Sequence, residues 1–173
     1  MRAKINLSGF FSEMNKKKSE IDKLVKHEMP KHAGTIGVEH VKQNFRKGGF
    51  VNNGLTKWKK SNREMHGGKG AKNNHRTLLS GRNHLYSSTK SIPNDAKVTI
   101  KNDAPYAGVH NWGLEGLVVV NPFTRKRNGK VQHVKGHTRN MNIPQRQFLG
   151  ESKEMNEEIR TKFVVELEKI FKQ

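Results

Sequence analysis

The C-terminal segment carries the most regular apolar pattern in the chain. Its large apolar side chains recur at helical spacing: Met155, Ile159, Phe163, Leu167 and Ile170 or Phe171. This spacing places them on one face of a helix over residues 151–172, and Ser152 can cap the N-terminus of that helix. The pattern therefore predicts an amphipathic helix with one face available for packing.

Two further helices are predicted near the N-terminus. Residues 10–29 place apolar side chains at helical spacing, and residues 34–46 carry a partial apolar face. Pro30 is expected to end the first helix or to begin the next element, because proline disfavours helical geometry in the residue before it. Gly48 and Gly49 are expected to stop the second helix.

Two strands are predicted in the middle of the chain. Residues 85–92 are rich in strand-compatible types, and residues 96–102 alternate, with Val98 and Ile100 inward. Turn-forming residues occupy 93–95, so the two strands are expected to form a hairpin.

The segment that follows mixes a short helix with strand. Residues 105–112 predict a short helical turn, and the apolar run 117–120 predicts a buried strand. Residues 130–134 are a candidate partner strand within the basic, polar stretch 123–142.

Together these elements predict one α+β domain over residues 1–173, a small antiparallel β-sheet packed by N-terminal helices and by a C-terminal amphipathic helix. Segments 50–76 and 121–142 are predicted to be flexible loops. Trp58 in the first loop is expected to dock on a core edge, with contact to a partner or ligand as the alternative.

Charge changes this picture. The chain has 173 residues, 32% of them hydrophobic and 28% charged, with a net charge of +19. Residues 1–60, 61–110 and 111–150 carry +9, +5 and +6, whereas residues 151–173 carry −1. Such a charge favours polyanionic partners and opposes self-association unless something compensates for it.

Cysteine is absent, which excludes disulfides, cysteine-ligated zinc and a thiol nucleophile. No apolar run approaches the roughly 20 residues that a membrane span needs. The N-terminus lacks the apolar stretch of a signal peptide. We therefore expect a protein that is soluble and intracellular when made, with no membrane partner.

Candidate enzymatic sites are weak. His133 and His137 are four residues apart but have no carboxylate nearby in the sequence, so solvated loop histidines explain them better than a zinc site. His110 and Asn111 resemble a fragment of a His-Asn-His nuclease without its metal ligands. Residues 67–70 are glycine-rich but lack the Lys-Ser/Thr pair of a phosphate-binding loop. We expect no catalytic residue, metal or cofactor.

Basic residues gather in clusters. Those that could face nucleic acid are Lys69, Lys72, Arg76, Arg125, Lys126, Arg127 and Lys130. They can neutralise phosphates without reading sequence, or they can be plain solvated surface, and the sequence leaves these two readings open. No helix-turn-helix, zinc-finger or aromatic RNA-binding motif accompanies them.

The order of several short motifs resembles the phage virion morphogenesis, or tail completion, family of Mu-like and related tailed phages. The matching positions are Trp58, Leu78-Leu79-Ser80-Gly81, Tyr106-Ala107, His110-Asn111-x-Gly113 and Pro144-x-Arg146-x-Phe148-Leu149-Gly150. The resemblance covers most of residues 10–172. Ser80 stands where the family usually has Thr, Asn111 stands where it has Gln, and residues 114–142 are longer and more basic.

The first group of motif residues has plausible structural roles. Tyr106 and Trp112 are expected to anchor the short helix on the sheet, and His110 to support the same frame. Gly113 is expected to allow a backbone turn that a side chain would obstruct.

The second group is expected to lead the chain into the last helix. Pro144 would fix an extended path, Phe148 and Leu149 would fill the core, and Gly150 would release the chain into the helix. Arg146 could bind carbonyls or the acidic first turn of that helix.

The resemblance implies a structural protein of the phage virion, assembled in the host cytoplasm and located in the neck or tail. It implies a ring, of six copies, that acts as a tail terminator and docks the tail to the head, in contact with tail-tube and connector or adaptor proteins. The alternatives are a nonspecific phage DNA-binding protein and, less favoured, a metal-dependent nuclease.

Overall fold

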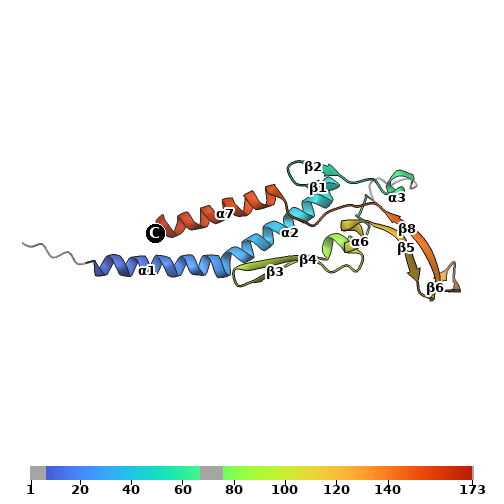
Figure 1. The fold of residues 1–173 in the computed structure, drawn as a ribbon, viewed down its shortest axis with the longest axis horizontal. Coiled ribbons are helices and arrows are strands. Elements are labelled where there is room, and N and C mark those ends of the chain that lie inside the picture. Colours follow the sequence, from blue (N-terminus) through green and yellow to red (C-terminus); the bar gives the residue numbers. More distant parts are fainter. Residues whose placement is uncertain (1–6, 67–75, 173) are drawn as a thin grey trace, which may run out of the picture.

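The computed structural model describes residues 7–66 and 76–172. The molecule is elongated: α1 (Ser8–Lys23) extends from one end and a β-arm extends from the other (Figure 1). The α+β class predicted from the sequence is confirmed. Within the described residues, however, the strands form four separate two-stranded antiparallel pairs rather than one small sheet.

The two predicted N-terminal helices are one continuous helical run. After α1 the chain passes through a π-helical turn, η1 (Leu24–Glu28), into α2 (Met29–Lys47). Pro30 lies in the first turn of α2, so it lacks the N–H that would bond the carbonyl of Lys26. The backbone N–H of Ala96 bonds that carbonyl instead, at 3.0 Å. The helix therefore widens before the proline and continues.

The predicted central hairpin is present, with a shifted start. Its strands are β3 (Thr89–Asn94) and β4 (Lys97–Asn102), and a short helix, α5 (His84–Ser87), replaces the predicted strand residues before β3. Pro93 pairs with Val98 inside the ladder, so the turn lies at residues 95–96 rather than 93–95. The side chain of Ile100 packs against Gly37 of α2, where an added Cβ would lie 1.9 Å from Ile100 Cδ1.

The segment after α2 contains short elements in its described part. Gly48 ends α2 in the left-handed region, with φ of 66°, as the glycine pair predicts. Then come β1 (Gly49–Val51), β2 (Leu55–Lys57) and α3 (Asn62–His66). Glu154 accepts hydrogen bonds from the N–H groups of Asn53 and Gly54, both at 3.1 Å. These bonds tie the β1–β2 turn to the start of the last helix.

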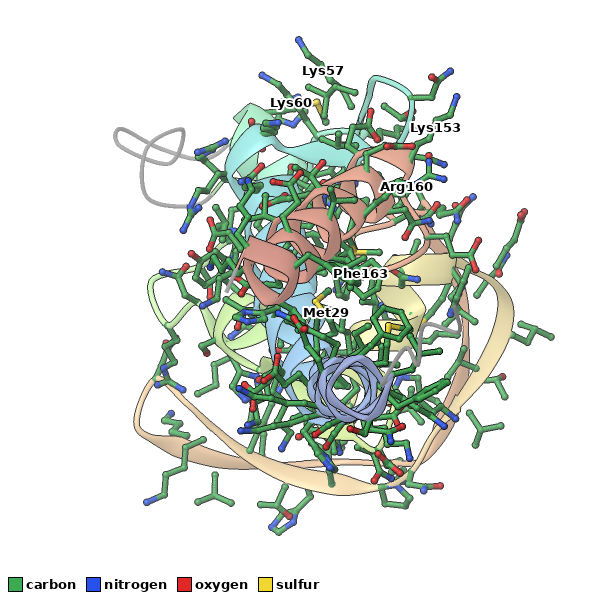
Figure 2. The ribbon with its side chains drawn as sticks, turned by 90° about the vertical axis from the view of Figure 1, so that its left-hand side faces the viewer. Met29, Lys57, Lys60, Lys153, Arg160 and Phe163 are labelled. Carbon is green, nitrogen blue, oxygen red and sulfur yellow. The ribbon has the colours of Figure 1, made fainter. Side chains whose placement is uncertain are left out.

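The last helix, α7 (Lys153–Lys172), is capped as predicted, since the N–H of Met155 bonds Ser152 Oγ at 3.3 Å. Its apolar stripe lies half-buried against α2 and α1. Phe163 and Met29 line one apolar groove between α7, η1–α2 and the β3–β4 turn, with a volume of about 510 Å³ (Figure 2). None of the helices in the described part of the chain has both the length and the apolar composition that crossing a membrane requires.

The arm spans residues 114–143. Strand β5 (Leu114–Val120) pairs with β8 (His137–Ile143), and β6 (Phe123–Arg127) pairs with β7 (Lys130–Val134) farther out. Two predictions are wrong here. The partner of the apolar run is β8 rather than residues 130–134, and the run is not buried, because Leu117 is 79% exposed and Val119 is 71% exposed.

The core lies where the C-terminal half of α2 meets the loops around it. Its buried apolar residues come from seven places in the sequence: Val41, Phe45, Trp58, Leu85, Ala104, Ala107 and Phe148. Trp58 docks on this core as predicted. Its ring lies edge-on to Phe45 with centroids 5.6 Å apart, and its Nε1 donates to the carbonyl of Gln147 at 2.6 Å.

Candidate functional site

Two buried asparagines hold the backbone at Phe148, the most deeply buried of the motif residues. Asn111 Oδ1 accepts hydrogen bonds from the N–H groups of Phe148 and Leu149, at 3.0 and 2.9 Å. Asn44 Nδ2 donates to the carbonyl of Phe148 at 3.1 Å. Residues 144–150 belong to no strand or helix, so these side chains satisfy polar groups that a β-ladder would otherwise satisfy.

Each amide makes a further bond, Asn111 within the same 144–150 segment and Asn44 to a second segment, β1. Asn111 Nδ2 donates to the carbonyl of Leu149 at 3.0 Å, and Asn44 Oδ1 accepts from the N–H of Val51 at 3.0 Å. Each side chain thus uses both its donor and its acceptor, which a carboxylate cannot do. Asn111 therefore holds the 144–150 segment through both ends of its amide.

Arg146 is buried to 8% exposure and binds carbonyls, one of the two roles expected for it. Its Nε donates to the carbonyl of Lys59 at 2.8 Å, and its backbone N–H donates to the carbonyl of His110 at 2.8 Å. The first turn of α7 is occupied instead by the β1–β2 turn. Burial lowers the pKa of Arg146 from its ordinary value.

His110 contacts the same segment through its carbonyl, which accepts from the N–H of Arg146. Its Nδ1 is buried and has no hydrogen-bond partner among the described residues, and burial, followed by the charge of Arg146, lowers its pKa. His110 and Arg146 line a cavity of about 230 Å³ together with Ser61, Thr77 and Tyr106 among others. Across residues 7–66 and 76–172, no three His, Asp or Glu side chains converge as metal ligands would.

The two histidines considered for zinc have separate partners. His133 Nδ1 lies 3.1 Å from Thr124 Oγ1 on the β6–β7 pair, and His137 Nδ1 lies 3.0 Å from the carbonyl of Lys135. The hydrogen bonds that the structure gives to the two rings therefore go to different groups.

Gly113 marks the place where the arm leaves the body. Its φ is 79°, and an added Cβ would lie 3.0 Å from the N of Gln145 and 3.1 Å from the carbonyl oxygen of Ile143. This close crossing is the turn that the sequence predicts. Pro144, half-buried, follows at the other end of the same crossing.

The aromatic anchors were predicted only in part. Tyr106 donates to or accepts from His84 Nδ1 at 2.7 Å and stacks edge-on against His110. Trp112 is 69% exposed, so the prediction that it anchors α6 (Ala107–Trp112) is wrong. Trp112 is the last residue of α6 and comes directly after Asn111, which packs inward. Neighbouring residues of a helix point in different directions, so the Trp112 side chain lies in solvent.

The remaining motif glycines differ. At Gly150 an added Cβ would lie 2.4 Å from Gln147 Nε2, the far end of a flexible side chain that can move aside. At Gly81 nothing lies within 4 Å, and the structure gives no reason for glycine there.

The predicted basic residues that the structure describes lie in two places. Arg125, Lys126, Arg127 and Lys130 all lie exposed on the β6–β7 pair. Arg76 lies in the body, where its guanidinium donates to the carbonyl of Arg46 at the end of α2. Lys69 and Lys72 lie outside the described residues.

Two features were missed in the sequence although a signal existed. Asn44 falls between Val41 and Phe45 on the apolar face of α2, and a polar residue in such a place indicates a buried hydrogen bond. Asn128-Gly129 lies within the basic stretch 123–142, and this dipeptide is typical of a tight two-residue hairpin turn.

Comparison with known proteins agrees with the motif order. The model of the phage virion morphogenesis family matches residues 26–168, which covers the core, the 144–150 segment and the whole arm. No significant match was found among curated proteins or among solved structures. The chain belongs to the phage virion morphogenesis family and therefore has a structural or assembly role in the phage particle.

Proposed function

We propose that the chain is a tail-completion protein of the tail-terminator type, whose copies form a ring at the head–tail junction. In this proposal the ring, of six copies as the family resemblance implies, finishes the tail and docks it to the head. Its neighbours would be the tail tube on one side and a connector or adaptor on the other. In this proposal the protein acts by assembling the virion rather than by catalysing a reaction.

The observation that carries the proposal is the uncovered arm. Apolar side chains of β5, β6 and β7 are open to solvent, with Leu117 79%, Val119 71%, Val131 54% and Phe123 44% exposed. A two-stranded ribbon alone in water is marginally stable, and large exposed apolar groups favour contact with another chain. A structural or assembly role in the phage particle would bring such a chain into contact with the arm.

A second apolar surface lies at the other end of the molecule. On α1, Phe10, Phe11 and Met14 are each more than half exposed, and Phe171 near the end of α7 is 62% exposed. Two different exposed apolar surfaces at opposite ends of the molecule favour head-to-tail contacts between copies (Figure 1). Head-to-tail contacts produce a ring when the rotation between neighbouring copies closes on itself.

Charge sets a condition on this assembly. A net charge of +19 on every copy makes copies repel one another at low ionic strength. The last segment, residues 151–173 at −1, is the least repulsive part and therefore the best placed to meet a basic neighbour. We expect ring formation to improve as salt rises from about 50 mM to about 300 mM, because screening shortens the range of the repulsion.

The test is electron microscopy of the purified chain, together with virions labelled by an antibody to it. Rings, and label at the neck, are the expected result. The variant Leu117→Ser/Val119→Ser should lose the rings, whereas the control Leu55→Ser/Ile92→Ser, which alters exposed apolar residues of the body, should keep them. A monomer under all salt conditions with label elsewhere on the particle would contradict the proposal.

A further inference from the structure

The outer part of the arm has two chemically different faces. In its register Arg125 lies opposite Gln132 and Arg127 lies opposite Lys130, so these four side chains share one face. A hydrogen bond from Arg125 Nε to Gln132 Oε1, at 3.1 Å, agrees with this pairing. We call these four residues the cationic face. The opposite face carries Thr124, His133, Lys126 and Val131.

A tight turn fixes the end of the cationic face. Asn128 and Gly129 have φ of 51° and 75°, the pair of positive values that a type I′ hairpin turn requires. Arg127 and Lys130 flank this turn and are therefore held side by side at the tip. In Figure 2 the ribbon of the arm extends beyond the outline of the helical body, so the tip is accessible.

The cations of the tip have no carboxylate to neutralise them. Residues 121–142 contain no Asp or Glu, and Glu115, the acid of the arm, lies at its base opposite Asn142. The ion pairs found in the described part of the chain lie in the helices and the body. A concentration of uncompensated charge on a projecting ribbon is stable only in water or against an anion.

The dimensions of the ribbon suit double-stranded DNA. Two antiparallel strands lie about 4.8 Å apart, and the major groove, about 12 Å wide, admits a two-stranded ribbon. Arg125 and Arg127 are two residues apart on one face, about 6.8 Å, which equals the rise of about two base pairs along the DNA axis.

We propose that the β6–β7 tip binds double-stranded DNA, with its cationic face against the phosphates that border a groove and without reading base sequence. Another copy of the chain is a poorer partner for this face, because residues 1–110 of every copy are themselves basic. The inference rests on the proposed function for the source of the duplex, which is the packaged phage DNA, but the binding itself does not depend on ring formation.

The test measures affinity for a fluorescein-labelled 20-base-pair duplex by anisotropy over a salt series. The variant is Arg125→Gln/Arg127→Gln/Lys130→Gln. Each lost phosphate contact removes about 0.9 from the slope of log affinity against log salt, so the slope should fall by about 3 and the affinity near 0.1 M salt by about 100-fold. Circular dichroism and the thermal midpoint should stay those of the parent chain.

Two controls make the result specific. Lys16→Gln/Lys18→Gln/Lys23→Gln removes the same charge from α1 and should weaken binding by less than about threefold, through the long-range field alone. Lys126→Gln, on the opposite face of the same strand, should keep most of the affinity. A second duplex of unrelated sequence should bind as tightly as the first.

Equal loss of affinity in the α1 control and the arm variant would overturn the inference, because general attraction between opposite charges would then explain the binding. Equal affinity for single-stranded DNA or for polyglutamate would overturn it as well. Microscopy of the same arm variant separates the two proposals. If the chain forms rings but the arm variant binds the duplex as tightly as the parent chain, this inference is refuted and the ring proposal stands. If duplex binding depends on the arm but no rings form, the ring proposal is refuted and this inference stands.

Discussion

The body and the arm use apolar residues in opposite ways. Phe148 in the body is 1% exposed, and Leu117 in the arm is 79% exposed, although each belongs to a short segment that the sequence predicts as buried. Phe148 belongs to a core cluster with residues of α2 and α5 and with Trp58, whereas the face of β5 that carries Leu117 and Val119 is open to solvent. Burial is therefore decided by which elements lie nearby, and an apolar strand without a cover is a surface for another molecule.

The same contrast holds for backbone hydrogen bonds. The irregular segment 144–150 is held by side chains from α2 and α6, which fixes one conformation. The arm is a regular ladder whose outer edges are open. Open edges can accept a further strand, so the arm is suited to contact other chains and the body is suited to hold it in place.

The largest difference is expected for truncation of the two apolar side chains. Phe148→Ala should lower the free energy of unfolding by about 3–5 kcal/mol, because a large ring leaves a closely packed core. Leu117→Ala should change it by less than about 0.5 kcal/mol. Urea denaturation followed by tryptophan fluorescence measures both, and similar effects at the two sites would erase the contrast.

Two asparagines test the hydrogen bonds in the same way. Asn111→Ala leaves two N–H groups and one carbonyl near Phe148 without partners and should cost about 3 kcal/mol. Asn140→Ala, at an exposed position opposite Leu117, should cost less than about 0.5 kcal/mol. The same denaturation experiment decides, and a small effect of Asn111→Ala would mean that the 144–150 segment does not depend on it.

Two glycines with similar φ test the boundary against the tip. Gly113→Ala combines an unfavourable φ with close contacts to residues 143 and 145, and should cost about 2 kcal/mol in global stability. Gly129→Ala also meets a positive φ, but in open space, and should affect only the local hairpin. Equal losses in the denaturation midpoint would show that the arm unfolds together with the body.

The smallest expected effect is a dependence on pH. Burial lowers the pKa of His40 and of His110, while in the unfolded chain both titrate near 6.5. Their contribution to stability is therefore complete above about pH 6.5 and is lost as pH falls through the lowered folded-state pKa.

Denaturation midpoints between pH 7.5 and 5 should decline accordingly, and His110→Gln should flatten the decline. A decline that His110→Gln leaves as steep as in the parent chain would contradict the assignment of His110 as a titrating group.

Local pattern was sufficient for much of the fold. The period of α7, its Ser152 cap, the glycine stop of α2 and the pairing of residues 96–102 all follow from neighbouring residues. Pro30 lies in the first turn of the next helix, one of the two outcomes predicted for it. The helical run nevertheless continues through it, and the distant N–H of Ala96 bonds the carbonyl of Lys26 that the proline leaves open. The exposure of residues 117–120 could not be foreseen, because period and propensity do not say whether a covering layer exists.

The positions of the motif residues around Phe148 were also predictable from the sequence in part. Phe148, Gly113 and Arg146 lie where their motifs suggest, and the lock on Phe148 by Asn44 is a contact across 104 residues. The β6–β7 hairpin lies between β5 and β8 in the sequence, and this arrangement brings Arg125, Arg127 and Lys130 to one tip. Arg76 was predicted to belong with these basic residues, but it lies in the body. Such long-range placement is a property of the whole fold.

The central claim is that a self-sufficient body holds an arm that is covered only on assembly. Hydrogen–deuterium exchange of the free chain and of the assembled oligomer tests it most directly. In the free chain, amides of residues 114–143 should exchange much faster than those of α2, and assembly should protect the arm while leaving α2 unchanged. Protection of the arm equal to that of α2 in the free chain, or an arm that stays unprotected in the oligomer, would contradict the claim.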